Sequence, residues 1–255
     1  DLEREVRDDA VIASNTSALP IAEIARDARV PERIVGMHFF SPVHRMQLIE
    51  IVRPPRADPD AVATAVGAAL RMGKTPIVVG DGPGFYTTRV LGTMLGEAFR
   101  MLEGGTAIDE IDRAMTAFGW PVGPLALVDE VGLEVAVHVA ETVSGLRGEA
   151  GPRIVAALVA EGKKGKSRGG GFYRYEGKRR TPEPRVYEIL RVAPMPAPAD
   201  VAERLTLTFV RECLSCLEEG VLRSPEEGDL GAVLGLGFPA YLGGPFAYAK
   251  ERGIR

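Results

Sequence analysis

The segment IVGMHFFSPVHRMQLIEIV, residues 34–52, places two apolar runs on either side of a polar turn. Each run has the length and the β-branched content of a strand, so the segment predicts strands over residues 34–40 and 48–52. His38 lies in the first run and Glu50 in the second. Such a pair is either a satisfied polar contact in the core or an acid–base pair at a ligand site.

The flanking sequence extends this pattern into an α/β domain. Residues 11–13 form a short apolar run that ends at the polar SNTS, residues 14–17, and TPIVVG, residues 75–80, is a further predicted strand. We expect a short helix over residues 20–28. A longer one is expected over residues 58–73, with Asp58 as N-cap, Pro59 in the first turn and Gly73 as terminator. Strands that alternate with helices indicate a partly parallel sheet.

The pattern changes after DGPG, residues 81–84. No further strand is expected, and helices are predicted over residues 86–105, 108–119 and 125–143. The predicted fold class is therefore α/β followed by all-α, with a boundary near residue 83.

The helical part contains an internal repeat. Residues 89–105 align with residues 204–220 at a constant offset of 115, and FGWPVGP, residues 118–124, resembles LGFPAYLGGP, residues 236–245. Two copies of one helical unit are the simplest interpretation, joined by a proline-rich segment. We expect three domains, residues 1–83, 84–180 and 181–255.

Composition narrows the class of protein. The chain has 255 residues, 45% hydrophobic and 26% charged, which is typical of globular proteins. A net charge of -4 argues against nucleic-acid binding, and no apolar run reaches the roughly 20 residues of a membrane span. The two cysteines, in CLSC at residues 213–216, are expected to be core thiols of a reducing compartment, with no metal site. Without a visible targeting signal, we expect a cytoplasmic location. The charged opening DLEREVRDDA begins within an amphipathic pattern without a cap, as we expect of a segment of a longer protein.

Of the three histidines, His38 is the candidate for chemistry. His44 lies in a polar turn and His138 on a predicted helix, where surface and structural roles are expected. His38 approaches the carboxyl end of a strand, where open α/β sheets bind ligands. A carboxylate partner holds a histidine in one tautomer, so that its other nitrogen can accept a proton. The residues alone leave the structural and the catalytic roles open.

Four segments in this order resemble the 3-hydroxyacyl-CoA dehydrogenase family: ASNTSALPI, ERIVGMHFFSPVHRMQLIEIV, GKTPIVVGDGPGFYTTRVL and FGWPVGPLALVDEVGLEV. GFYTTR and the repeat most resemble the dehydrogenase part of the α subunit of multifunctional fatty-acid oxidation enzymes. The resemblance implies a partial NAD-binding, Rossmann-type domain followed by two helical units of the family's C-terminal type. It also implies NAD-dependent oxidation of 3-hydroxyacyl-CoA to 3-oxoacyl-CoA in fatty-acid β-oxidation.

The resemblance assigns roles to individual residues. The histidine of the family's H-F-F motif is the catalytic base, which is His38 here, and the glutamate twelve residues later, Glu50, orients it. The serine after N-T, Ser17, contacts nicotinamide and substrate. Ser41 stands where the family usually has an asparagine near the cofactor.

Two further positions complete the expected site. Thr88 takes a substrate-binding position where asparagine is commoner, and Tyr248 is expected to line the acyl-CoA site by the same likeness. The expected cofactor is NAD, and the expected partners are an acyl-CoA substrate and either a second copy of the chain or a thiolase-type subunit.

One part of the family pattern does not occur in this sequence. A dinucleotide-binding domain holds the cofactor pyrophosphate on a G-x-G-x-x-G turn, and the 255 residues contain none after a strand. The glycine cluster in KKGKSRGGGFYRY, residues 163–175, is interpreted as a loop whose lysines face solvent or the phosphates of CoA. The alternative function is therefore a non-catalytic helical module, residues 84–255, that dimerises or binds a partner.

Overall fold

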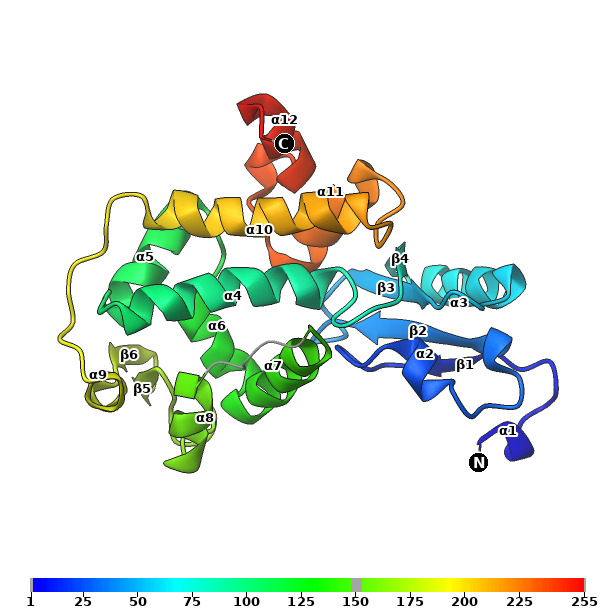
Figure 1. Cartoon of the computed structure of the whole chain (residues 1–255), viewed down its shortest axis with the longest axis horizontal. Coiled ribbons are helices and arrows are strands. Elements are labelled where there is room, and N and C mark those ends of the chain that lie inside the picture. Colours follow the sequence, from blue (N-terminus) through cyan, green and yellow to red (C-terminus); the bar gives the residue numbers. More distant parts are fainter. Residues whose placement is uncertain (1, 148–152, 255) are drawn as a thin grey trace. The chain divides into compact units, whose positions relative to one another are not determined.

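The computed structural model describes residues 2–147 and 153–254 and divides the chain into two compact units (Figure 1). The sheet unit comprises Asp1–Arg89 and Glu212–Arg255, and the helical unit comprises Val90–Arg211. The division falls within two long helices, α4 (Thr87–Glu103) and α10 (Val201–Glu218). The three predicted domains group the residues differently from these two units, and that three-part division stays a prediction.

The sheet unit is built on four strands, β1 (Ile12–Ser14), β2 (Ile34–Phe39), β3 (Leu48–Arg53) and β4 (Thr75–Gly80). The strands lie in the order β1-β2-β3-β4, with β1 parallel to β2, β2 antiparallel to β3 and β3 parallel to β4. The predicted partly parallel α/β sheet is thereby confirmed. Before and between the strands lie α1 (Leu2–Glu5), the short α2 (Ile21–Ile24) and a 3₁₀ turn η1 (Pro31–Arg33).

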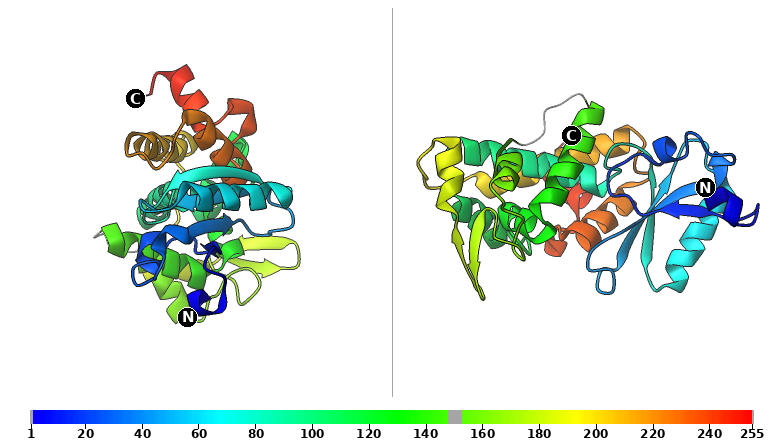
Figure 2. Two further views of the ribbon diagram at one scale, coloured as in Figure 1. Left: turned by 90° about the vertical axis from the view of Figure 1, so that its right-hand side faces the viewer. Right: turned by 90° about the horizontal axis from the view of Figure 1, so that it is seen from below.

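The alternation of side chains along the strands gives the sheet two different faces. One face packs on α3 (Pro59–Arg71), which lies along the sheet in Figure 2. The core between them is made by these buried residues: Val35, Ile49, Ile51, Ala61, Val62, Ala65, Ala69 and Val78. As predicted, the side chain of Asp58 caps α3 by accepting the backbone N–H of Asp60. Since successive strand residues point to opposite faces, His38 and Glu50 lie on the face away from α3.

That second face is covered by segments from both ends of the chain. Gly36 packs against Ile21 of α2. The helix α11 (Pro225–Gly231) contacts β4, and the π-helical turn η2 (Ala232–Leu236) contacts β3. The sheet unit ends with η3 (Ala240–Leu242) and α12 (Pro245–Arg252).

The helical unit contains the larger part of α4, then α5 (Ile108–Phe118), α6 (Pro124–Val131), α7 (Leu133–Arg147), α8 (Arg153–Ala160), α9 (Pro184–Leu190) and the first part of α10. The single helix expected over residues 125–143 is wrong. The chain breaks at Gly132, whose φ of 100° does not fit a helix and favours glycine. None of the helices in the described ranges is both long and apolar enough to cross a membrane.

The expectation of no strand after residue 84 is also wrong. A hairpin of β5 (Tyr173–Glu176) and β6 (Arg179–Pro182) lies in the helical unit. Its two-residue turn begins with Gly177 at a φ of 62°, which fits a type II′ hairpin turn. The short alternation Tyr-Arg-Tyr was obscured by the adjoining glycine cluster.

The predicted repeat is visible in two reciprocal ion pairs between α4 and α10. Arg89 Nε lies 2.5 Å from Glu212 Oε1 in the sheet unit, and Arg204 pairs with Glu97 in the helical unit. At the offset of 115, Arg89 corresponds to Arg204 and Glu97 to Glu212. Each arginine therefore binds the glutamate of the other copy, as in an antiparallel pair of equivalent helices.

A second equivalence confirms that the copies share a fold. Asp112 accepts the backbone N–H groups of Leu125 and Ala126 at 2.9 and 3.0 Å, at the start of α6. In the second copy, Asp229 accepts that of Phe246 at 2.7 Å, at the start of α12. In both copies an aspartate side chain accepts hydrogen bonds at the start of a helix, α6 or α12, where the first amides have no intrahelical acceptor.

Candidate active site

His38 and Glu50 form a buried pair on the face of the sheet away from α3. They are direct cross-strand neighbours in the β2–β3 register, and His38 Nδ1 lies 2.7 Å from Glu50 Oε2. His38 is 6% exposed and Glu50 is fully buried. An ionised carboxylate only accepts hydrogen bonds, so Nδ1 carries the proton and donates it, which leaves Nε2 as an acceptor.

The first turn of α4 completes the hydrogen bonds of the Glu50 carboxylate. Thr87 donates its backbone N–H to Oε1 at 2.9 Å and its hydroxyl to Oε2 at 2.6 Å. The N-terminus of a helix favours a negative charge, and every oxygen of the buried carboxylate has a donor. Thr87 was not among the site residues predicted from the sequence. The signal was that a buried Glu50 needs donors, and Thr87 stands beside Thr88 at the start of a predicted helix.

Two aromatic rings enclose the imidazole. The Phe40 ring centroid lies 4.7 Å and that of Phe85 6.1 Å from the His38 ring. Phe85 is buried and adopts a φ of 50°, which is uncommon for a bulky residue and costs about 1–2 kcal/mol. The tight turn into α4 therefore places an apolar ring beside the histidine and limits water around it.

The loop after β1 is fixed next to the end of β2. Asn15 Oδ1 accepts the backbone N–H of Phe39 at 2.9 Å, and Gly84 donates its N–H to Ala18 O at 2.9 Å. Asp81 accepts the N–H groups at the start of α2 at 2.8 and 2.7 Å, and its partial burial raises its pKa. Ser17 is half-buried in this loop after β1. The contacts fix the loop to the end of β2 on one side and to the turn before α4 on the other.

The other predicted site residues differ in their surroundings. Thr88 is half-buried in the first turn of α4, directly after Thr87. Ser41 is exposed in the turn that follows β2. Tyr248 is buried in α12, where its ring contacts Phe238 at 6.3 Å between centroids and the Arg252 guanidinium at 4.9 Å. Three of the predicted residues therefore lie on segments that adjoin His38 in the chain or by hydrogen bonds: Ser17, Ser41 and Thr88. Tyr248 instead contacts residues of the second copy of the helical repeat, Phe238 and Arg252.

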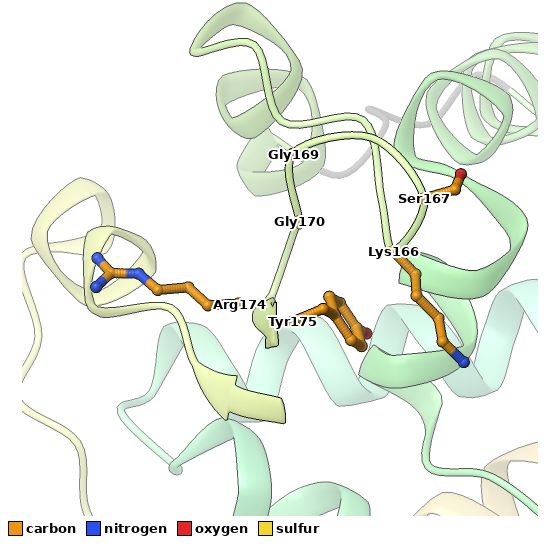
Figure 3. Close-up of a pocket in the computed structure, with 6 residues that line it drawn as sticks. All are labelled: Lys166, Ser167, Gly169, Gly170, Arg174 and Tyr175. Carbon is orange, nitrogen blue, oxygen red and sulfur yellow. The ribbon is translucent and has the colours of Figure 1, made fainter. Parts of the chain in front are cut away.

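The lysine- and glycine-rich loop forms a separate pocket in the helical unit. The loop lines a cavity of about 300 Å³. Figure 3 shows its lining residues, Lys166, Ser167, Gly169, Gly170, Arg174 and Tyr175. Lys166 pairs with Glu130 at 2.8 Å and Arg174 with Glu183 at 2.7 Å. Because both cations already have carboxylate partners, the contacts favour a solvated charge cluster over a phosphate site.

The two cysteines are core residues, as predicted. Cys213 and Cys216 are fully buried, and the Cys213 thiol lies 3.3 Å from the Tyr86 hydroxyl. Burial raises the pKa of the Cys213 thiol, which disfavours the reactive thiolate. In the described residues no cluster of histidine, cysteine and carboxylate side chains has the geometry of a metal site.

Comparison with known proteins identifies the family. Residues 1–82 match the model of the 3-hydroxyacyl-CoA dehydrogenase NAD binding domain, and residues 84–175 match that of the 3-hydroxyacyl-CoA dehydrogenase C-terminal domain. The fatty acid oxidation complex subunit alpha of Shewanella loihica is 41% identical over 261 residues, which cover 100% of this chain and 37% of that protein.

Solved structures are also similar to this chain, and two of them cover nearly all of it. The 3-hydroxybutyryl-CoA dehydrogenase of Escherichia coli shares the fold at a TM-score of 0.78 and 23% identity, over 95% of this chain and 68% of that one. The dehydrogenase part of multifunctional enzyme 1 from C. elegans has a TM-score of 0.61 and 29% identity, over 95% of this chain and 57% of that one. The chain belongs to the 3-hydroxyacyl-CoA dehydrogenase family, and the predicted family, fold class and NAD cofactor are confirmed at that level.

The residues present fit one end of the cofactor. Ser17 and Thr88 are half-buried on segments that adjoin His38 in the chain or by hydrogen bonds, and their hydroxyls are donors that would suit a nicotinamide amide and a reacting oxygen. The glycine-rich turn that would hold the pyrophosphate does not occur in the 255 residues. This chain's own groups therefore fit the nicotinamide end of NAD.

Proposed function

We propose that the sheet unit holds the active site of an NAD-dependent dehydrogenase that oxidises 3-hydroxyacyl-CoA to 3-oxoacyl-CoA in fatty-acid β-oxidation. The observation that supports this most strongly is the buried His38–Glu50 pair, with Nδ1 held 2.7 Å from a carboxylate oxygen. The family that the chain belongs to agrees with this chemistry.

In this proposal, His38 is the general base. Its Nε2 accepts the proton of the substrate's 3-hydroxyl, while Glu50 stabilises the imidazolium that results. Bound NAD⁺ supplies the acceptor for the hydride that leaves C3. General-base catalysis contributes about 10²- to 10⁴-fold to a rate, and the aromatic enclosure strengthens the His38–Glu50 interaction by limiting water.

The remaining roles belong to the same proposal. Ser17 and Thr88 hold the substrate oxygen and Ser17 also contacts the nicotinamide. Both residues are half-buried and lie on segments that adjoin His38 in the chain or by hydrogen bonds. Ser41 contacts the cofactor from the turn after β2. Tyr248 contributes to the acyl-CoA site through the core of the second copy.

The relatives suggest the setting. They are named as alpha subunits of a fatty acid oxidation complex, and this chain spans 37% of their length. We propose an acyl-CoA substrate, a thiolase-type partner subunit or a second copy of the chain, and a cytoplasmic location. The absence of a G-x-G-x-x-G turn from these residues supports the alternative, a helical module that assembles without catalysis.

The test is an assay of NADH oxidation with acetoacetyl-CoA. The chain is measured as it stands and also in place of the matching 37% of the Shewanella loihica relative. Turnover in either form that requires both NADH and the CoA thioester supports the dehydrogenase. A folded protein that shows no turnover in both forms, yet self-associates in light scattering, contradicts it and favours the helical module.

A further inference from the structure

The Glu50 carboxylate depends on one residue for two of its three hydrogen bonds. Thr87 donates its N–H to Oε1 and its hydroxyl to Oε2, and Oε2 is also the oxygen that His38 Nδ1 contacts. Thr87, like Glu50, is fully buried. No water therefore needs to enter to satisfy either side chain.

The backbone and the hydroxyl of Thr87 have separable roles. The N–H is one of the first amides of α4 and would need an acceptor in any case, so its bond to Oε1 is explained by the start of the helix. The hydroxyl has no such requirement. At this position it binds the same oxygen that orients the imidazole.

The hydroxyl supplies a constraint that the glutamate side chain lacks. The last torsion of a glutamate is broad, so the plane of its carboxylate is set by external donors. The side chain of Thr87 is β-branched and restricted at χ1, which makes its hydroxyl a fixed donor. Two donors from one residue, one to each oxygen, hold the carboxylate plane in a single orientation.

We propose that Thr87 is a positioning residue of the active site, which holds Glu50 Oε2 in line with His38 Nδ1. This inference rests on the proposed function, because the pair must act as a base for its orientation to matter. The family resemblance implied a role in the site for Thr88 and none for Thr87.

The test compares Thr87→Val, which keeps the shape and the amide but removes the hydroxyl, with Thr87→Ser, which restores it. Thr93→Val is the matched control, because the Thr93 hydroxyl also lies on α4 but donates to Val90 O at 2.8 Å. A short N–H···O⁻ hydrogen bond gives a far-downfield ¹H NMR signal. The signal is assigned to the His38 Nδ1 proton if it disappears in the His38→Gln variant. The signal is read without cofactor or substrate.

We expect Thr87→Val to move this signal upfield and broaden it, and to lower kcat for NADH oxidation about tenfold with KM little changed, equivalent to about 1.4 kcal/mol. Thr87→Ser should recover both, and Thr93→Val should change neither. An unchanged signal in Thr87→Val, or equal losses in the valine and serine variants, would overturn the proposal. A Thr87-dependent signal in a protein without turnover would instead reject the dehydrogenase function.

Discussion

The replacement of Glu50 by glutamine is predicted to reverse the tautomer of His38. Glutamine has nearly the same shape but offers one acceptor oxygen and one donor NH₂ where glutamate offers two acceptors. The backbone N–H of Thr87 points at the Oε1 position from 2.9 Å and can only donate. The amide oxygen must therefore take that position, which leaves the NH₂ group at the position of Oε2.

The NH₂ group then faces two atoms that can both adapt. The Thr87 hydroxyl, 2.6 Å from Oε2, can accept a hydrogen bond instead of donating one. His38 Nδ1, 2.7 Å from Oε2, can accept only if the proton moves to Nε2. Leaving two donors opposed in this buried site would cost about 1–3 kcal/mol, a factor of roughly 5 to 150 in population, so the Nε2–H tautomer is favoured.

The functional consequence follows from the same atoms. With Nε2 protonated, His38 no longer has a lone pair for the substrate proton, and the rate should fall by about 10²- to 10⁴-fold. The melting temperature should change little, because the hydrogen bonds are rearranged rather than lost and a buried charge is removed.

The assay is ¹⁵N NMR of the histidine rings, read together with the rate of NAD⁺ reduction with 3-hydroxybutyryl-CoA, the direction in which Nε2 must accept the proton. We expect the wild-type His38 pattern to show a protonated Nδ1, and Glu50→Gln to show a protonated Nε2. A variant that keeps Nδ1 protonated, or one that reverses the tautomer at an unchanged rate, would refute the reasoning.

Two further predictions concern stability. A Cβ at Gly36 would lie 2.6 Å from Val52 Cβ, so Gly36→Ala should destabilise the fold by about 1–3 kcal/mol and lower the melting temperature by about 2–12 °C. Gly67→Ala lies in the middle of α3, where the nearest atom to the added Cβ is 3.4 Å away, and should raise the melting temperature. Equal melting temperatures of the two variants in calorimetry would contradict the packing at Gly36. Burial raises the pKa of Asp129 from 3.8 to about 6, so the folded protein binds this proton more tightly than the unfolded chain does. The resulting stabilisation is fully present below about pH 4 and is lost as the pH rises through 6, a change of about 3 kcal/mol in the free energy of unfolding. Denaturant titrations at pH 4 and 7 should show this loss in the wild type and not in Asp129→Asn, and identical pH dependence in both would disprove it.

The sequence predicts the sheet and the His38–Glu50 pair because both depend on local regularities. The two strands are joined by a short turn, and the period of two in an antiparallel pair puts both side chains on one face. The repeat was equally accessible, since the arginine and glutamate positions recur at one offset and pair reciprocally.

The parts that were missed depend on tertiary contacts or on single backbone angles. Thr87 becomes important only because the start of α4 meets β3, a tertiary contact that its place at the start of a predicted helix does not specify. The break between α6 and α7 depends on the backbone angle of Gly132, within an otherwise helical pattern. The β5–β6 hairpin is two strands of four residues each beside a glycine cluster, which is too short for periodicity to separate from a loop.

The central claim is that His38 takes the proton of the substrate. The most direct measurement is the rate of NAD⁺ reduction with 3-hydroxybutyryl-CoA for His38→Gln beside His44→Gln, whose histidine lies exposed in the turn between β2 and β3. We expect His38→Gln to lose about 10²- to 10⁴-fold in kcat with its fold intact, and His44→Gln to keep the wild-type rate. A His38→Gln enzyme that retains most of its rate would contradict the assignment of the base.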